Sequence, residues 1–267
     1  MNSSLWHTDF GEGPLVATAI HEGSYVRPEV APLLKIDAAR RRYEEDPFTA
    51  AWTAIASTRI VGNVSRFEFD LNRPRDRAVY LSPADAWGLD VWKSPPPVEV
   101  VERSRRAYDD FYAHFGLVLE RLLRRHPRVV VFDFHSYNHG REGAQSSLAD
   151  PELNPEINLG TKSLDRTLWS PVVDRWLAEM RGYDYFGRPL DVRENVKFFG
   201  GEMARWTHQQ FPGRVGVLAI EVRKFFMNEW TGQVDEVQLH RLREAFQRAA
   251  AGVGRILENW GDATTDL

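Results

Sequence analysis

Short apolar runs alternate with longer segments of helical periodicity along this chain. Most of the runs are near-continuous, which is typical of strands that helices cover on both faces of a sheet. One segment, "TRIVGNVSRFEFD", alternates apolar and polar residues instead and indicates one or two strands. The pattern predicts strands at residues 14–20, 58–70, 128–135 and 215–222.

Helical periodicity is clearest from residue 100 to 126, where the apolar residues fall on one side and Pro127 ends the helix. Residues 138–165 hold several Pro, Asn and Gly and predict a long irregular loop, a feature that is often functional. Strands that alternate with helices indicate an α/β fold, in which helices flank a central, mostly parallel or mixed sheet. We find no linker or repeat and expect one domain over 1–267. Further helices are predicted at about 31–46, 165–181 and 234–259.

Composition restricts the partners more than it identifies them. The chain has 267 residues, with 34 Lys and Arg against 38 Asp and Glu, so its slight acidity argues against a nucleic-acid partner. No apolar run approaches the roughly 18 residues of a membrane span, and the first residues lack the pattern of a secretory signal. We therefore expect a cytoplasmic protein without a membrane partner. The oligomeric state is not predicted.

Three of the predicted strands end in polar residues that could bind a metal. Apolar runs lead directly to His21 with Glu22, to His135 and to Glu221. Sites in open α/β sheets gather at the carboxyl ends of strands, and two histidines with a carboxylate are a set that catalytic zinc uses. The chain has no cysteine, so a metal here must use His, Asp or Glu. A single histidine after a strand is more often structural, but three such residues together favour a metal site.

The stretch "SRFEFDLNR" adds groups that bind anions. Arg73 can hold a carboxylate through two parallel hydrogen bonds, and Asn72 can share it. Arg66 could reach a carbonyl oxygen on which negative charge develops. The alternative is a surface arginine cluster paired with acids.

The motifs together resemble a known family. "AIHEGSYVRPE", "EEDPFT", "SRFEFDLNR", "DFHSYNHGR", "NPEINLGT", "DVRENVKFFGG" and "AIEVRKFFMNEWTG" occur in order and resemble the N-formylglutamate amidohydrolases. That family is related in fold to the zinc carboxypeptidases and aspartoacylase, a phosphorylase/hydrolase-like α/β fold. The resemblance implies a small N-acyl amino acid as substrate, with N-formyl-L-glutamate split into formate and glutamate.

The resemblance also implies roles for six residues of these motifs. His21 and His135 would be ligands of one zinc ion, and Glu221 would be the general base. Arg66 would polarise the scissile carbonyl, while Asn72 and Arg73 would hold the substrate's carboxylate.

Four carboxylates are candidates for the third zinc ligand: Glu22, Glu29, Glu45 and Asp46. The carboxypeptidase pattern His-x-x-Glu would need Glu at position 24, where this chain has Ser24. Glu22 follows His21 directly, and adjacent side chains of an extended chain point to opposite faces. Glu29 could instead begin a helix. The "EEDPFT" stretch lies where the family carries an acidic residue, so we favour Glu45, with Asp46 as the alternative.

Several further residues are candidates for the pocket. Asp133 lies two positions before His135 and could orient that histidine. Arg205, after two glycines, could meet a second substrate carboxylate, and Lys224 is expected to point elsewhere if its strand continues. A different amide substrate, or a binding protein that has lost catalysis, are the alternatives to the hydrolase. Residues just past His135 that could line the pocket are Asn138, His139 and Arg141.

Overall fold

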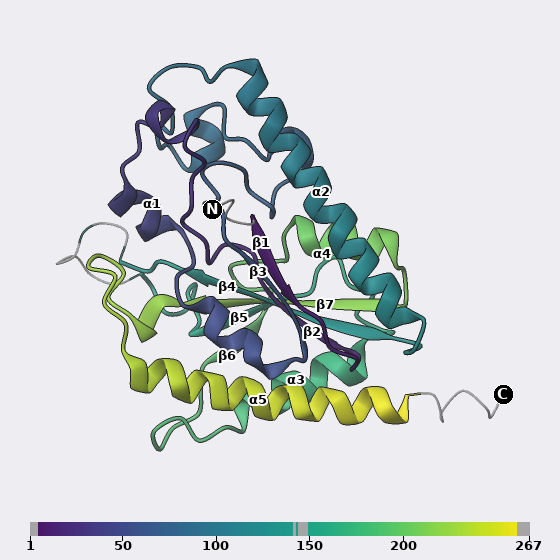
Figure 1. Ribbon diagram of the computed structural model, residues 1–267. Helices are drawn as coiled ribbons and strands as arrows, with labels where there is room; N and C mark the ends of the chain where they lie inside the picture. The colour runs from purple at the N-terminus through teal and green to yellow at the C-terminus, as the bar shows by residue number, and fades with distance from the viewer. Residues whose placement is uncertain (1–4, 141–142, 144–148, 261–267) are drawn as a thin grey trace.

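A mixed sheet of seven strands forms the centre of the protein (Figure 1). The computed structural model describes residues 5–140, 143 and 149–260. In sheet order the strands are β1 (Trp6–Asp9), β3 (Thr58–Gly62), β2 (Leu15–Ala19), β4 (Val129–Tyr137), β7 (Val215–Arg223), β5 (Ile157–Gly160) and β6 (Val192–Glu194). β2, β3, β4 and β7 run parallel, whereas β1 is antiparallel to β3, and β5 is antiparallel to β7 and parallel to β6.

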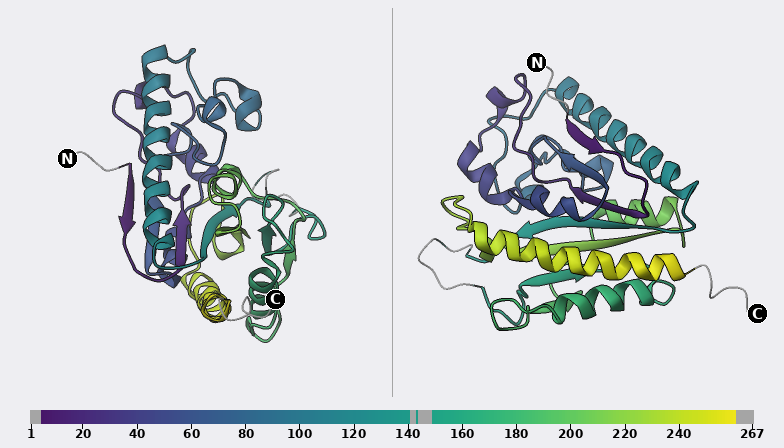
Figure 2. Two further views of the ribbon diagram at one scale, coloured as in Figure 1. Left: turned by 90° about the vertical axis from the view of Figure 1, so that its right-hand side faces the viewer. Right: turned by 60° about the horizontal axis from the view of Figure 1, so that its bottom comes forward.

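Helices cover both faces of this sheet (Figure 2). α2 (Val98–Leu123) and α4 (Glu202–Gln210) pack on one face, and α3 (Ser170–Arg181) and α5 (Glu236–Asn259) pack on the other. Alternate residues of β4 point to opposite faces, so Val131 joins the core under α2 while Phe132 joins the core under α5. Both faces are therefore buried, which explains the near-continuous apolar runs. In the part of the chain that the structure describes, no helix is long and apolar enough to cross a membrane.

The predicted α/β class, the mixed sheet and the flanking helices are confirmed. The strand predicted at 58–70 is only half right, because β3 ends at Gly62. Beyond it the backbone bonds leave the sheet: the Ser65 amide donates to Tyr25 and the Asp70 amide donates to Ala78. Phe67 and Phe69 are buried in two different clusters, so their alternation reflects a loop anchored on both sides.

Other differences arise from short elements. The predicted loop at 138–165 contains β5, which has four residues with the polar Asn158 among them. β1, β6 and α4 were not predicted because they have three to nine residues and little apolar periodicity. The helix predicted at 31–46 is divided into a 3₁₀ turn (Ala31–Leu33) and α1 (Ala38–Glu44), which begins where Asp37 accepts a hydrogen bond from the Arg40 amide.

Candidate metal centre and active site

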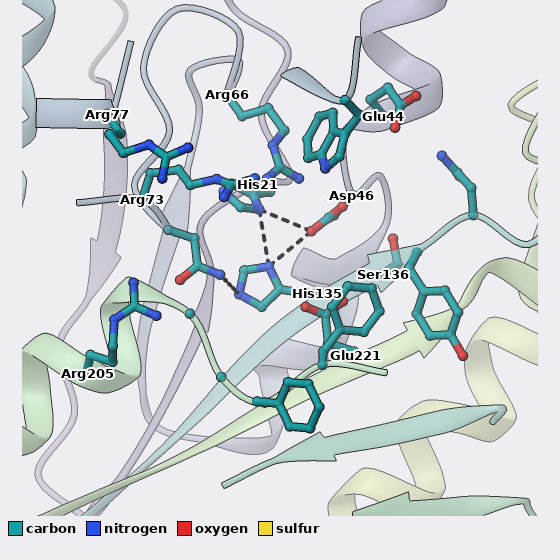
Figure 3. A pocket seen from close by; sticks show the side chains of 18 of the residues that line it. His21, Glu44, Asp46, Arg66, Arg73, Arg77, His135, Ser136, Arg205 and Glu221 are labelled. Atoms are coloured by element: carbon teal, nitrogen blue, oxygen red, sulfur yellow. Dashed lines mark hydrogen bonds and ion pairs between the residues drawn. The ribbon is translucent and has the colours of Figure 1, made fainter. Parts of the chain in front are cut away.

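A pocket of about 370 Å³ opens at the carboxyl ends of the central strands (Figure 3). The two histidines, Asp46, Glu221 and the proposed substrate-binding residues all line this pocket, whereas Glu45 does not. These residues come from well-separated parts of the chain, and the parallel strands bring several of them to one edge of the sheet.

The register of the two longest strands fixes the centre of the site. β4 and β7 pair in parallel, and His135 lies directly opposite Glu221. His21 follows β2, the neighbour of β4 on the other side. All three residues therefore leave adjacent strands at the same level, as the sequence predicts.

His21, Asp46 and His135 form a buried group that could hold a metal ion (the metal group), and their ligand atoms lie within 4.8 Å of one another. The two Nδ1 atoms are 3.2 Å apart, and Asp46 Oδ2 lies 3.4 Å from His21 Nδ1 and 3.1 Å from His135 Nδ1. Asp46 Oδ1 is buried and has no hydrogen-bond partner among the described residues. Each of the three side chains thus directs a ligand atom toward the same small space.

The far nitrogen of each histidine is held by a carboxylate. His21 Nε2 lies 2.8 Å from Asp70 Oδ1, and His135 Nε2 lies 3.0 Å from Asp133 Oδ2. Ionised carboxylates only accept hydrogen bonds, so both Nε2 atoms carry the proton and both Nδ1 atoms can present a lone pair. Paired carboxylates of this kind orient histidines that bind metals.

Two lone pairs and a carboxylate in a buried space repel one another unless a positive charge lies between them. Burial lowers the pKa of His135, but Asp133 and Asp46 outweigh it and raise that pKa well above the usual range. Burial raises the pKa of Asp46, yet hydrogen bonds with His135 and His21 hold it below its ordinary value. The donor set therefore fits a divalent cation, and a proton on His135 would compete with that cation.

Of the four carboxylates considered as third ligand, only Asp46 lies in this group. Glu45, which the sequence favours, accepts a hydrogen bond of 2.5 Å from Ser65 and does not line the pocket. Glu22 accepts from the Ala50 amide at 2.9 Å and does not line the pocket. Glu29 pairs with Arg103 at 3.0 Å.

Glu221 is suited to proton transfer near neutral pH. Its side chain opens onto the pocket, but the surrounding protein removes most of its hydration. This burial raises the pKa of Glu221 to about 8, while the charge of His135 acts in the opposite direction. A carboxyl group with a pKa near the working pH can accept and return a proton.

Asp70 joins the metal group to Arg66. Its Oδ1 faces His21, while its Oδ2 accepts from Arg66 Nη2 at 2.7 Å and from the Tyr80 hydroxyl. The Arg66 guanidinium also stacks on Trp87, with 4.9 Å to the ring centroid. Burial raises the pKa of Asp70, but Arg66 and His21 hold it well below its usual range. One buried carboxylate thus positions a histidine and an arginine together.

A basic wall lies on one side of the metal group. Figure 3 shows Arg73, Arg77 and Arg205 on the side away from Ser136 and Glu44. The Arg73 guanidinium stacks on Trp87 at 5.9 Å and has no ion pair within the described part of the chain. Asn72 Oδ1 accepts from the Met203 amide at 3.2 Å, which turns its Nδ2 toward His135. Arg205 is more exposed and pairs with Glu202 at 2.8 Å.

Three residues contribute to the site in ways that the sequence does not predict. Asp70 lies in the arginine-rich stretch, but nothing in the pattern indicates that it contacts both His21 and Arg66. Asn158, opposite Glu221 in the register, accepts from the amides of residues 196 and 197 and so holds the segment leading to Phe199 in the pocket wall. Lys224 was expected to point elsewhere, but β7 ends at Arg223 and the chain turns, so Lys224 lines the pocket.

The remaining candidates have defined places. Asn138 lines the pocket, and its Oδ1 is buried without a partner among the described residues. His139 lies 3.4 Å from Glu229, outside the pocket lining. Arg141 lies outside the described residues.

The assignment of Asp46 can be tested by metal binding. We expect Asp46→Asn to weaken zinc binding by more than the roughly 10–100-fold typical of losing an outer hydrogen-bond partner. Glu45→Gln is the matched control, because the amide keeps an oxygen for Ser65, and its affinity should stay near that of the wild type. Competition with a chromogenic chelator measures both. Loss of zinc in Glu45→Gln with normal binding in Asp46→Asn would instead make Glu45 the ligand.

Comparison with known proteins shows the family to which this chain belongs. A family model described as N-formylglutamate amidohydrolase matches residues 13–227. The structure is similar to N-formylglutamate amidohydrolase from Ralstonia eutropha JMP134, with a TM-score of 0.74 and 17% identity over 96% of this chain and 98% of that one. It is also similar to gene product Atu2144 from Agrobacterium tumefaciens, with a TM-score of 0.65 and 18% identity over 94% and 96%.

At these identities the two structures show the fold alone, and no curated protein sequence matches the chain. The expected likeness to zinc carboxypeptidases stays a prediction. The family match, in contrast, spans residues 13–227, which include His21, Asp46, His135 and Glu221. This protein belongs to the N-formylglutamate amidohydrolase family.

Proposed function

We propose that this protein is a zinc-dependent hydrolase that cleaves N-formyl-L-glutamate into formate and L-glutamate. The observation that carries the proposal is the convergence of His21, Asp46 and His135 beside Glu221 in one pocket. Two imidazoles and one carboxylate leave room for further ligands, which is the pattern of catalytic zinc sites. Membership of the amidohydrolase family supports the reaction class.

Zinc in this group would polarise the scissile carbonyl and make a water molecule more acidic. Glu221 then acts as general base: its carboxylate takes a proton from the attacking water as the new carbon–oxygen bond forms. The same carboxyl group returns the proton to the amide nitrogen as the carbon–nitrogen bond breaks. Arg66 faces the carbonyl and stabilises negative charge on its oxygen, and Asp70 holds the guanidinium in place.

The basic wall would select an acidic amino acid. Arg73 has no ion pair within the described residues, so its guanidinium is available for the α-carboxylate, with Asn72 beside it. Arg205 lies on the same side of the pocket and would meet the side-chain carboxylate of a glutamyl group. Two carboxylates on the substrate therefore match two arginines on this wall.

The reaction can be tested by a formate-release assay over N-formyl and N-acetyl amino acids. We expect N-formyl-L-glutamate to be the best substrate, because the basic wall offers partners for both of its carboxylates. Removal of metal with a chelator should abolish turnover, and added zinc should restore it. Unchanged turnover in metal-free protein would contradict the zinc dependence, and preference for a neutral amino acid would contradict the assigned specificity.

Glu221→Gln should lower kcat by about 10²–10⁴-fold, because the amide cannot accept the proton. The base acts when ionised, so wild-type activity should rise with pH through the pKa of Glu221. That pKa is about 8 without a cation, and a bound cation would lower it, so the rise should be centred below pH 8. The variant should lose this limb of the pH–rate profile. Zinc content and thermal unfolding serve as controls, and a profile unchanged in Glu221→Gln would exclude the role.

Arg73→Ala should mainly raise KM, since it removes a hydrogen-bonded charge pair with the substrate carboxylate. Such bonds contribute about 1.5–3 kcal/mol, which corresponds to roughly 10–150-fold in KM. Arg75→Ala is the matched control, because Arg75 lies two residues away and pairs with Asp109 on the surface. Steady-state kinetics of both variants measure the effect, and equal KM values would dismiss the assignment of Arg73.

A further inference from the structure

Asp46 reaches the metal group by a different route from the two histidines. His21 and His135 leave strands whose backbone is fixed by neighbours in the sheet. Asp46 instead lies two residues beyond the end of α1, where the chain belongs to no strand or helix. Its own amide donates to the carbonyl of His21 at 3.0 Å. The position of the Asp46 carboxylate therefore depends on the other contacts that fix this segment.

Lys224 and Asn138 bind this segment from the other side. Lys224 Nζ donates to the carbonyls of Tyr43 and Glu45, at 2.7 Å each. Asn138 Nδ2 donates to the same Tyr43 carbonyl at 2.9 Å. The last carbonyls of a helix have no partner within the helix, so these donors complete the end of α1. Two of the three bonds come from one side chain, and the second of them is to Glu45, the residue immediately before Asp46.

The two donors are linked to the catalytic strands by register. His135 and Glu221 face each other on β4 and β7, and Asn138 and Lys224 each lie three positions further along. The strand ends that carry a metal ligand and the base therefore also hold the backbone that carries the third ligand. A shift of the end of β4 would move His135 and Asn138 together, and a shift of the end of β7 would move Glu221 and Lys224 together.

The burial of Lys224 indicates that its ammonium group serves to bind the two carbonyls. Its side chain is only 1% exposed, which is rare for lysine and costly unless the ammonium is hydrogen-bonded. Burial lowers the pKa of Lys224 to about 8, while the charges of Asp46, Glu44 and Glu229 act in the opposite direction. A neutral side chain of the same length would fill the space but would leave the two carbonyls without a donor.

We propose that Lys224 is a positioning residue that fixes the end of α1, holds Asp46 against His21 and His135, and thereby sets the affinity for the metal. This inference rests on the proposed metal site. The competing role is contact with the substrate, because Lys224 also lines the pocket. The two roles differ in what they change: positioning changes metal affinity, whereas substrate contact changes turnover of the metal-loaded enzyme.

The test compares zinc binding to metal-free Lys224→Met with that of the wild type, by competition with a chromogenic chelator. Met matches the length of Lys but donates no hydrogen bond. We expect the dissociation constant to rise by about 10–100-fold, the range typical of lost outer partners of a metal site. At saturating zinc, kcat should return to near the wild-type value. Arg223→Met is the matched control: Arg223 also donates to a backbone carbonyl, that of Asn154, away from the pocket, and its variant should bind zinc normally.

Unchanged zinc affinity in folded Lys224→Met, with reduced kcat at saturating zinc, would overturn the inference in favour of substrate contact. If that variant does not fold, Asn138→Ala decides, because it removes one neutral bond to the Tyr43 carbonyl and no charge. Its dissociation constant for zinc should rise about fivefold, and an unchanged value would overturn the inference. A wild-type protein that binds no zinc would overturn the proposed function, whereas failure of the inference alone leaves wild-type binding intact.

Discussion

The parallel pairing of β4 with β7 is the constraint on which the site depends. It sets His135 opposite Glu221, so a proposed metal ligand and the proposed base lie at one level on neighbouring strands. A slip of one residue would turn one of them to the other face of the sheet. The slip is resisted because both faces are covered by helices, and the apolar residues of β4 alternate between the two core clusters: Val129 and Val131 in one, Val130, Phe132 and Phe134 in the other. Packing far from the pocket therefore maintains the chemistry within it.

Charge compensation explains how so many ionisable groups can be buried together. Asp133 is held by Thr18 and His135, and Asp70 is held by Arg66 and His21. These pairs leave the Nδ1 atoms of the two histidines facing each other and Asp46 Oδ2, and Asp46 Oδ1 has no partner among the described residues. Burying polar groups without partners is costly, so a cation between these atoms would stabilise the cluster. The same neighbours that stabilise the fold thus create the site for a cation.

The sequence could predict those parts of the site that depend on local pattern. A near-continuous apolar run marks a strand, and His21, His135 and Glu221 are recognisable because each follows such a run directly. The choice of Asp46 over Glu45 was not predictable in this way. The two carboxylates are adjacent, and which of them reaches the histidines depends on how the end of α1 packs against residues 138 and 224. The role of Asn158 likewise depends on a contact with a segment nearly forty residues away.

The loop after β3 shows how one pattern can mislead about structure and still indicate the site. Its alternation suggested a strand, but Phe67 and Phe69 anchor the loop in separate clusters. Polar residues fixed between such anchors are buried with them: Glu68 and Asp70 are fully enclosed. Each then requires a charged partner, and Asp70 finds Arg66 on one side and His21 on the other. The apolar positions of this stretch supply its anchorage, and its polar positions supply the network that connects His21 to Arg66 through Asp70.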